Sequence, residues 1–346
     1  MRAVGFNTPQ PINVLTSLVD LELPEPVANG HDLLVEIRAV SVNPVDTKVR
    51  NTATVEDGTH RILGYDAAGI VKAVGPDVTL FEPGDEVFYA GAINRQGTNA
   101  EFHLVDERIV GSKPKSLSFE EAAALPLTAI TAYEALFHRM KVQDPVLSAE
   151  RAILIIGGAG GVGSIAVQLA RELTDLVIIA TASRPRTEAW VRKIGAHHVV
   201  DHSKPLAPQI KELGIGAPAF VFSTTQTDRH MADIIELIAP QGRLSLIDDS
   251  NKPMDLRPFK SKALSIHWEM MFARPVWQTA DMIEQHKLLN HVSELVDAGR
   301  IRTTLSEIYG TINATNLKQA HAMIESGRTV GKIVLSGFDA AASHEQ

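Results

Sequence analysis

The 346-residue chain contains no cysteine, and this absence excludes more than any other feature of its composition. Without cysteine there is no disulfide, no thiol nucleophile and no cysteine-ligated metal. Aromatic residues are scarce at 5%, and no apolar run reaches the roughly 18 residues that a membrane-spanning helix needs. The longest apolar stretch, residues 152–170, is interrupted by five glycines. We therefore expect no membrane insertion.

The charge balance is also informative. The net charge is −8 and the pI is near 5.9, so the chain lacks the basic character that nucleic acid binding requires. The first residues show no signal-peptide pattern and run directly into strand-like sequence. A content of 45% apolar and 21% charged residues is ordinary for a globular protein of about two domains. We expect a cytoplasmic protein with neither nucleic acid nor a membrane as partner.

Two kinds of pattern divide the chain. Up to about residue 120, short strand candidates are separated by turns rich in Gly, Pro and Asp, which indicates a small barrel or sandwich (33–40, 64–71 and 87–90). From residue 151 to about 246, strands and amphipathic helices alternate as in a doubly wound sheet. The expected strands are 152–156, 176–180, 199–200, 219–222 and 243–247, and the expected helices are 164–173, 187–194, 207–213 and 231–238. Further helices are expected at 128–139, 280–298 and 316–326, and a last strand at 331–335.

The sharpest motif is a glycine-rich turn between a strand and a helix. It has the form Gly-x-Gly-x-x-Gly and follows the apolar run 152–156 directly. Glycines are needed here because the chain turns tightly and its amides approach a pyrophosphate more closely than a Cβ permits. The start of the following helix also favours an anion. We expect a dinucleotide to bind at Gly158, Ala159, Gly160, Gly161, Val162 and Gly163, and the alternative is a connector without a ligand.

The end of the second strand selects between the two nicotinamide dinucleotides. A site for NAD places Asp or Glu there, about 20 residues after the loop, to hold the ribose 2′-hydroxyl. This chain has Thr-Ala-Ser-Arg-Pro-Arg at 181–186 and no acid before Glu188. Arg184, with Ser183 beside it, would bind a 2′-phosphate through charge-assisted hydrogen bonds of about 1.5–3 kcal/mol each. The sequence thus predicts NADP(H), and the alternative for Arg184 is a solvated helix start.

With these motifs, the sequence resembles the medium-chain dehydrogenase/reductase superfamily, in its quinone oxidoreductase and zinc-type alcohol dehydrogenase-like branch. The resemblance is carried by residues 41–48, 64–69, 84–87, the glycine loop and 331–335. It implies an α/β fold with a GroES-like β-barrel catalytic domain, residues 1–124 completed by 273–346. It also implies a doubly wound Rossmann NADP-binding domain, residues 125–272, an active site between the domains and, commonly, a homodimer. For residues 267–275, three interpretations remain: a dimer interface, a wall of the substrate pocket, or core packing.

Departures from the zinc-dependent relatives concern the metal ligands. Those relatives carry cysteine where this chain has Asn43, histidine where it has Tyr65, and a third ligand in the place of Leu127. A zinc site calls for thiolate, imidazole or carboxylate ligands, which these three residues do not supply. None of the 13 histidines has a clean i,i+4 spacing with a carboxylate partner. The expectation is a protein without zinc.

The activity follows from that expectation together with the resemblance. Without a metal to stabilise an alkoxide, alcohol oxidation is hard, whereas reduction of a conjugated substrate is easier. The resemblance therefore implies an NADPH-dependent oxidoreductase that reduces small quinones or conjugated enones by hydride transfer. Two alternatives are an enoyl-thioester reductase and a catalytically silent NADPH-binding sensor or structural protein.

The catalytic candidates lie at or near the positions that replace the metal ligands. Tyr65 would donate its phenol to a carbonyl or relay a proton, and the alternative is a buried strand tyrosine. Asn43 would donate its amide to the substrate, or would cap a helix that starts Asn-Pro-Val-Asp. The same two interpretations, a catalytic role and a structural role at the helix start, apply to Asp46.

Four further residues are expected to contact the cofactor by family position. Thr128 would approach the nicotinamide, and the alternative is the N-cap of helix 128–139. Ser223 and Asp248 follow strands whose carboxyl ends bind ligands in such sheets. Lys332 resembles a cofactor-contacting lysine, and the alternative is a solvated lysine.

Overall fold

The computed structural model describes residues 1–147, 149–250 and 253–338, which form two compact units. The first unit comprises Met1–Leu127 and Phe272–Gln346, and the second comprises Thr128–Met271. These limits lie a few residues from the domain limits that the sequence led us to expect.

The described residues of the first unit form ten strands. They are β1 (Arg2–Phe6), β2 (Val19–Glu22), β3 (Asp32–Val42), β4 (Arg61–Ile62), β5 (Ala67–Val74), β6 (Glu86–Tyr89), β7 (Phe102–Asp106), β8 (Val110–Ser112), β15 (Leu305–Thr311) and β16 (Lys332–Ser336). Seven of them form a mixed sheet of order β15-β16-β3-β5-β6-β8, with β7 paired to β3, and the others form the sheet β2-β1-β4. The long strand β3 lies at the centre and pairs with β5, β7 and β16, so residues distant in sequence meet along it.

The helices of the first unit are short apart from three. They are η1 (Leu15–Ser17), α1 (Pro44–Thr52), η2 (Glu107–Ile109), α2 (Phe119–Ala123), α8 (Ala273–Trp277), α9 (Glu284–Asp297) and α10 (Ala314–Glu325). Ser118 and Glu121 cap the start of α2 reciprocally. The helix expected from residue 280 begins only at Glu284, because Gln278 adopts a left-handed φ of 49° and the next residues form turns.

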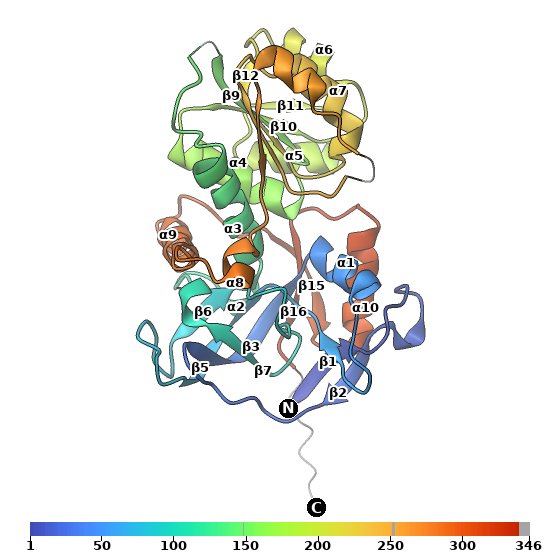
Figure 1. Cartoon of the computed structure of the whole chain (residues 1–346), viewed down its shortest axis with the longest axis vertical. Coiled ribbons are helices and arrows are strands. Elements are labelled where there is room, and N and C mark those ends of the chain that lie inside the picture. Colours follow the sequence, from blue (N-terminus) through green and yellow to red (C-terminus); the bar gives the residue numbers. More distant parts are fainter. Residues whose placement is uncertain (148, 251–252, 339–346) are drawn as a thin grey trace, which may run out of the picture. The chain divides into compact units, whose positions relative to one another are not determined.

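The second unit is a six-stranded parallel sheet with helical connections (Figure 1). Its strands are β9 (Glu150–Ile156), β10 (Val177–Thr181), β11 (His198–Val200), β12 (Pro218–Ser223), β13 (Arg243–Leu246) and β14 (Ser265–Trp268), in the order β11-β10-β9-β12-β13-β14. Its helices are α4 (Gly161–Leu173), α5 (Pro185–Lys193), α6 (Leu206–Glu212), α7 (Thr227–Leu237) and η4 (Arg257–Lys262). The elements predicted between 151 and 247 are all present, within a few residues of their predicted ends.

The core of the second unit explains why its strands were easy to predict. Residues 152–156 of β9 are all buried, as in a parallel strand covered on both faces. Apolar side chains from β9, β12, β13, α6 and α7 form one cluster, which includes Leu154, Val221, Leu244, Leu206 and Ile234. Strand order reverses between β9 and β12, and the carboxyl ends of the strands there carry the expected cofactor residues.

One predicted helix start is wrong. The helix expected over 128–139 with Thr128 as its N-cap begins at Pro126, as α3 (Pro126–Tyr133), and continues as the π-helical segment η3 (Glu134–Arg139). Proline is favoured in the first helical turn, where its missing N–H has no partner to lose. Thr128 is therefore inside the first turn, buried, and not a cap.

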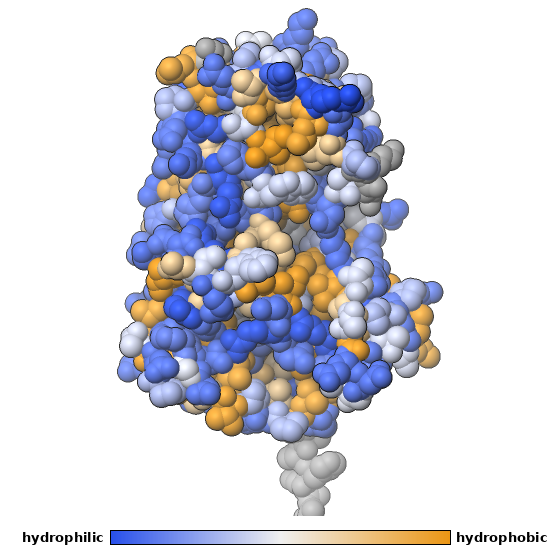
Figure 2. All heavy atoms as spheres, in the orientation of Figure 1, coloured by the Kyte–Doolittle hydropathy of each residue, from blue (hydrophilic) through white to orange (hydrophobic). Residues whose placement is uncertain are grey.

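The surface is mixed in polarity. Figure 2 shows hydrophilic and hydrophobic side chains interspersed on the face drawn, in keeping with a mean hydropathy of +0.01. Within the described ranges no helix has the length and apolar character to span a bilayer.

Candidate functional site

The glycine loop leaves β9 as a tight turn. Gly157 has a φ of 80°, and its N–H donates to Thr181 Oγ1 at the end of β10 (2.9 Å). A Cβ on Gly163 would lie 2.2 Å from the Gly157 carbonyl oxygen, so only glycine lets α4 pack on the turn. A Cβ on Gly160 would meet, among the described atoms, only that oxygen within 4 Å, at 3.4 Å. An added side-chain atom would therefore clash at Gly163, whereas the loop leaves room for one at Gly160. Sequence reasoning had not singled out Gly157, because only its backbone conformation reveals it.

The start of α4 has no side-chain cap. Gly160 is the N-cap residue, and the helix begins at Gly161, three residues before the start that was expected. The first N–H groups of a helix lack carbonyl partners within it and concentrate partial positive charge. This geometry fits a pyrophosphate, which would bind the open amides directly.

The two residues predicted to bind a 2′-phosphate lie on the surface at the end of β10. Ser183 and Arg184 are both exposed and follow the strand after a single intervening residue. Arg184 occupies the N-cap position of α5, and its main-chain N–H donates to Thr187 Oγ1 (3.1 Å). The Thr187 hydroxyl oxygen therefore accepts a main-chain N–H at the start of this helix. No carboxylate occurs between Thr181 and Glu188.

Two further basic residues lie near this strand end. His202 Nδ1 is 3.0 Å from Thr181 Oγ1, and Arg229 donates to the Ser203 carbonyl oxygen (3.3 Å). Burial lowers the pKa of His202, the Asp201 carboxylate offsets this in part, and the charges of Arg229 and Arg184 lower it further. Both guanidinium groups therefore act on the same imidazole. Sequence reasoning missed His202 and Arg229, because they come from other loops and form no motif with Arg184.

Ser223 and Asp248 are brought together at the carboxyl ends of β12 and β13. Ser223 Oγ is 2.8 Å from Thr227 Oγ1, whose own main-chain N–H donates to Asp248 Oδ2 (2.9 Å). The Asp248 carboxylate also accepts from the Thr227 hydroxyl. Both predicted residues thus take part in one hydrogen-bonded chain at the start of α7.

In the first unit, two of the substituted metal-ligand positions, Asn43 and Leu127, bind one buried carboxylate, that of Asp66. Asp66 is fully buried and lies between Tyr65 and the start of β5. Its oxygens accept four hydrogen bonds, from Leu127 N–H (2.7 Å) to Oδ1 and from Asn43 Nδ2 (2.8 Å), Ser41 Oγ (2.8 Å) and Lys332 Nζ (3.0 Å) to Oδ2. Sequence reasoning did not single out Asp66, and the only available signal was an acidic residue directly after Tyr65.

Lys332 is buried within this cluster, with 3% of its surface exposed. Its ammonium donates to the Val42 carbonyl oxygen (3.1 Å), to Asp66 and to Asn43 Oδ1. An ammonium group has three N–H donors, so all of them are used inside the protein. The alternative of a solvated lysine is therefore wrong.

Asn43 occupies the N-cap position of α1, followed by Pro44, as predicted, but its side chain does not cap the helix. Instead Asp46 secures this start, because its Oδ2 accepts the Asn43 main-chain N–H (2.7 Å) and its Oδ1 accepts that of Gly64 (3.0 Å). Burial raises the pKa of Asp46 to about 7, although both N–H groups and Lys332 lower it. The Asn43 side chain is thus left free to join the Asp66 cluster.

Tyr65 is 1% exposed and lies in the turn before β5, so it is not the strand tyrosine of the alternative interpretation. Its hydroxyl oxygen accepts from Arg61 Nη2 (3.3 Å), and its ring meets Phe272 edge-on at 5.4 Å. Burial raises the pKa of Tyr65. The phenol is therefore neutral near pH 7 and retains its proton for donation.

These donors do not fit a zinc ion. The Asn43 amide is engaged by Lys332 and Asp66, Tyr65 is a neutral phenol, and Leu127 has no ligand atom in its side chain. An ammonium group beside Asp66 also repels a divalent cation. Elsewhere in the described ranges, no group of three His, Asp or Glu could hold a metal.

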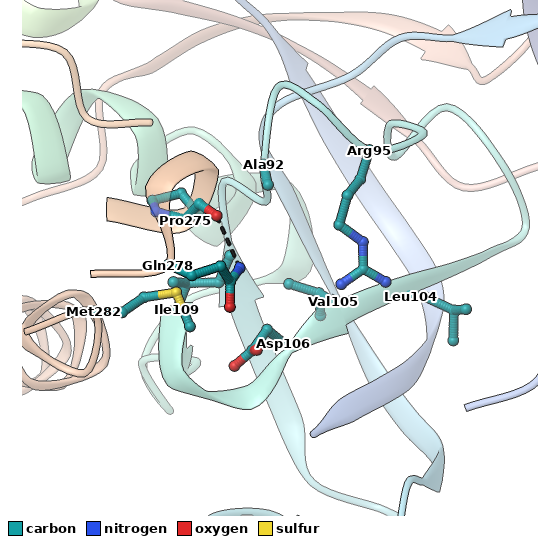
Figure 3. A pocket seen from close by; sticks show the side chains of 9 residues that line it. All are labelled: Ala92, Arg95, Leu104, Val105, Asp106, Ile109, Pro275, Gln278 and Met282. Carbon is teal, nitrogen blue, oxygen red and sulfur yellow. Dashed lines mark hydrogen bonds between the residues drawn. The ribbon is translucent and has the colours of Figure 1, made fainter. Parts of the chain in front are cut away.

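The first unit has a small pocket away from this cluster (Figure 3). It encloses only about 10 Å³, far below the ~300–1,000 Å³ of typical small-molecule sites. Its charged groups are already paired, Arg95 with Asp32 (2.7 and 2.9 Å) and Asp106 with Arg108. It offers no unpaired charge for a ligand.

Comparison with known proteins agrees with this description. The alcohol dehydrogenase GroES-like domain family matches residues 29–128, and the zinc-binding dehydrogenase family matches residues 194–335. The zinc-type alcohol dehydrogenase-like protein of Staphylococcus aureus is 42% identical over 97% of this chain and 100% of its own length.

Two solved structures extend the comparison. A Rhizobium etli CFN 42 protein named for zinc-dependent alcohol dehydrogenases is 65% identical, with a TM-score of 0.96 over 98% of this chain and 99% of that one. The Escherichia coli quinone oxidoreductase, solved in complex with NADPH, is 22% identical with a TM-score of 0.80 over 97% and 100% of the two chains, a likeness of fold alone. The expected fold class, a GroES-like domain with a doubly wound Rossmann sheet, is confirmed. The chain belongs to the medium-chain dehydrogenase/reductase superfamily, in its zinc-type alcohol dehydrogenase-like and quinone oxidoreductase branch.

Proposed function

We propose that this oxidoreductase uses NADPH without zinc to reduce quinones or conjugated enones. The observation that supports this choice of cofactor is the end of β10, where the guanidinium groups of Arg184 and Arg229 both act on His202 and no carboxylate occurs between Thr181 and Glu188. A carboxylate in that stretch would repel a 2′-phosphate, whereas the two guanidinium groups attract it. The NADPH complex of the E. coli quinone oxidoreductase, which shares the fold, supports the same cofactor.

The cofactor residues follow from this proposal. The pyrophosphate would bind the amides of Gly158 to Gly163, and the 2′-phosphate would bind Ser183 and Arg184. The proposal keeps Thr128, Ser223, Asp248 and Lys332 as contacts to the rest of the cofactor. Since all three Lys332 donors are used, its contact would be made by its stem or through Asn43.

The substrate side is assigned to Tyr65, Asn43 and Asp46. Bound NADPH supplies a hydride to the substrate. The substrate oxygen then gains negative charge, which N–H and O–H donors stabilise in a low-dielectric setting. Tyr65 and Asn43 offer such donors. Asp46, with a pKa of about 7, is able to hold a proton close to them at neutral pH.

The absence of zinc ligands supports the choice of reaction. Alcohol oxidation needs the alkoxide to be stabilised, which zinc does in many enzymes. The Asn43, Tyr65 and Leu127 positions cannot supply that metal. Reduction of a quinone or an enone needs only a hydride, a proton and donors to the oxygen.

The test is NADPH consumption by the purified chain, with and without a chelator, against quinones, enones and enoyl-CoA thioesters. Turnover of quinones or enones that survives chelation is the expected result. Preference for enoyl-CoA would favour the thioester reductase, and tight NADPH binding without turnover would favour a sensor. One bound zinc per chain together with alcohol oxidation would overturn the proposal.

Arg184→Met tests the cofactor assignment. Loss of one charge-assisted bond of about 1.5–3 kcal/mol should raise the KM for NADPH by about 10- to 150-fold and leave that for NADH unchanged. Arg192→Met is the matched control, because Arg192 lies on the same helix and is paired with Glu188 (2.9 Å). Equal Michaelis constants for the two cofactors in the unmodified protein would contradict the assignment.

We also propose that a second copy pairs along β14. This strand has β13 as its one partner in the described sheet, and Trp268 and Met270 are 55% and 54% exposed beside the open edge. Unpaired edges favour pairing with another strand. Light scattering should give the mass of a dimer, and a monomer at micromolar concentration would refute this.

A further inference from the structure

The neighbours of the Asn43 amide fix which way it points. Lys332 has only donors, and an ionised Asp66 has only acceptors. The Asn43 carbonyl oxygen faces Lys332 Nζ, and the amide nitrogen faces Asp66 Oδ2 at 2.8 Å. The opposite orientation would set N–H against N–H and oxygen against oxygen. The amide therefore has a single allowed orientation in this cluster.

One donor of the cluster is left over. The Asn43 amide nitrogen carries two hydrogens, and Asp66 accepts one of them. Within the described part of the chain no group accepts the second. The hydroxyl of Ser41 and the three N–H groups of Lys332 all have acceptors. The cluster thus retains one uncommitted N–H, and it is on the residue that stands where zinc-dependent relatives carry a ligand.

We propose that Asp66 and Lys332 are positioning residues that lock the Asn43 amide so that its remaining N–H is the hydrogen-bond donor to the substrate oxygen. This rests on the proposed function, since it requires a substrate oxygen that gains negative charge. The ammonium and carboxylate charges cancel within the cluster. The site therefore stabilises an oxyanion by a fixed dipole, with no metal and no net charge.

The energetics of buried ion pairs support a positioning role. Lys332 and Asp66 are both nearly inaccessible, with side-chain exposures of 3% and 0%. A buried pair is often no more stabilising than well-packed neutral groups, whereas removing one partner strands a charge. A neutral pair in the place of Lys332 and Asp66 would lack their fixed pattern of donors and acceptors.

The test compares Asp66→Asn, Lys332→Met and the double variant. Each single variant should melt well below the unmodified protein, because one buried charge loses its partner. The double variant should recover most of that melting temperature. Its kcat with the best quinone should still be at least tenfold low, because neither neighbour then orients Asn43. The Kd for NADPH should change much less than kcat, since the glycine loop and Arg184, which would bind the phosphates, lie in the second unit and are untouched.

The matched control is Asp32→Asn with Arg95→Met, which removes another carboxylate–cation pair of the first unit (2.7 Å). It should keep the unmodified kcat. A stable double variant Asp66→Asn/Lys332→Met with unmodified kcat would overturn the positioning role while leaving the proposed function intact. Failure of the unmodified protein to oxidise NADPH with any substrate would overturn the proposed function, and the role of Asn43 with it.

Discussion

Two buried glutamates share one arginine in the second unit, and this arrangement makes stability depend on pH. Glu269 Oε2 accepts from Arg139 Nε (2.8 Å), and Glu134 Oε2 lies 4.0 Å from the same guanidinium. The side-chain exposures of the two glutamates are 0% and 1%, and that of Arg139 is 36%. Burial raises the pKa of Glu269 from 4.5 to about 8, and the charge of Glu134 adds to this while Arg139 opposes it.

The sign of the effect follows from linkage. Folded Glu269 holds its proton more tightly than the unfolded chain does, so this contribution to stability is complete below pH 4.5. It is lost as the pH rises from there through about 8. At about 1.36 kcal/mol per pH unit, the full loss is on the order of 5 kcal/mol, an upper figure because the two carboxyls titrate together.

Glu269→Gln removes this titration and keeps the shape of the side chain. The free energy of unfolding of the variant, relative to the unmodified protein, should rise by several kcal/mol between pH 5 and pH 8.5. Urea unfolding at a series of pH values, followed by tryptophan fluorescence, measures this difference. His267 lies two residues away and is present in both proteins, and burial lowers its pKa in each of them.

Glu212→Gln is the control, because Glu212 is exposed on α6. Its difference from the unmodified protein should not vary with pH. A Glu269→Gln difference that is equally flat would refute the reasoning, because the proton on Glu269 would then make no contribution to stability.

Two other predictions concern single positions. Arg50 is fully buried and donates to the Gln10 carbonyl oxygen and to Glu325, so Arg50→Met should lower the free energy of unfolding by about 3–5 kcal/mol in urea titrations. Unchanged stability would show that these contacts are dispensable. Gly163→Ala would place a methyl group 2.2 Å from the Gly157 carbonyl oxygen, so calorimetric titration should show NADPH affinity at least tenfold weaker than in the unmodified protein. An unaltered Kd would mean that the loop does not hold the pyrophosphate.

The sequence predicted the second unit well because its strands are continuous apolar runs between amphipathic helices. In the first unit, predictions from the sequence were poor for strands that are short or that pair with strands distant in sequence. β2 and β15 were not foreseen: β2 has only four residues, and burial along β15 does not alternate regularly. The start of α3 was missed for a tertiary reason, because Asp66 accepts the Leu127 N–H at the first turn.

The candidate site divides in the same way. The glycine loop was foreseen because strand, turn and helix are contiguous in sequence. The buried cluster was not, because Asp66 and Lys332 are 266 residues apart and meet only through the pairing of β16 with β3. Tyr65 and Asn43 were selected as substitutions for metal ligands, but the partners of their polar atoms came only from the structure.

Calorimetric titration of the unmodified chain with NADPH and with NADH tests the central claim most directly. We expect NADPH to bind at least tenfold more tightly, because the groups at the end of β10 would meet its additional phosphate. Equal affinities for the two dinucleotides, or no heat with either, would contradict the account.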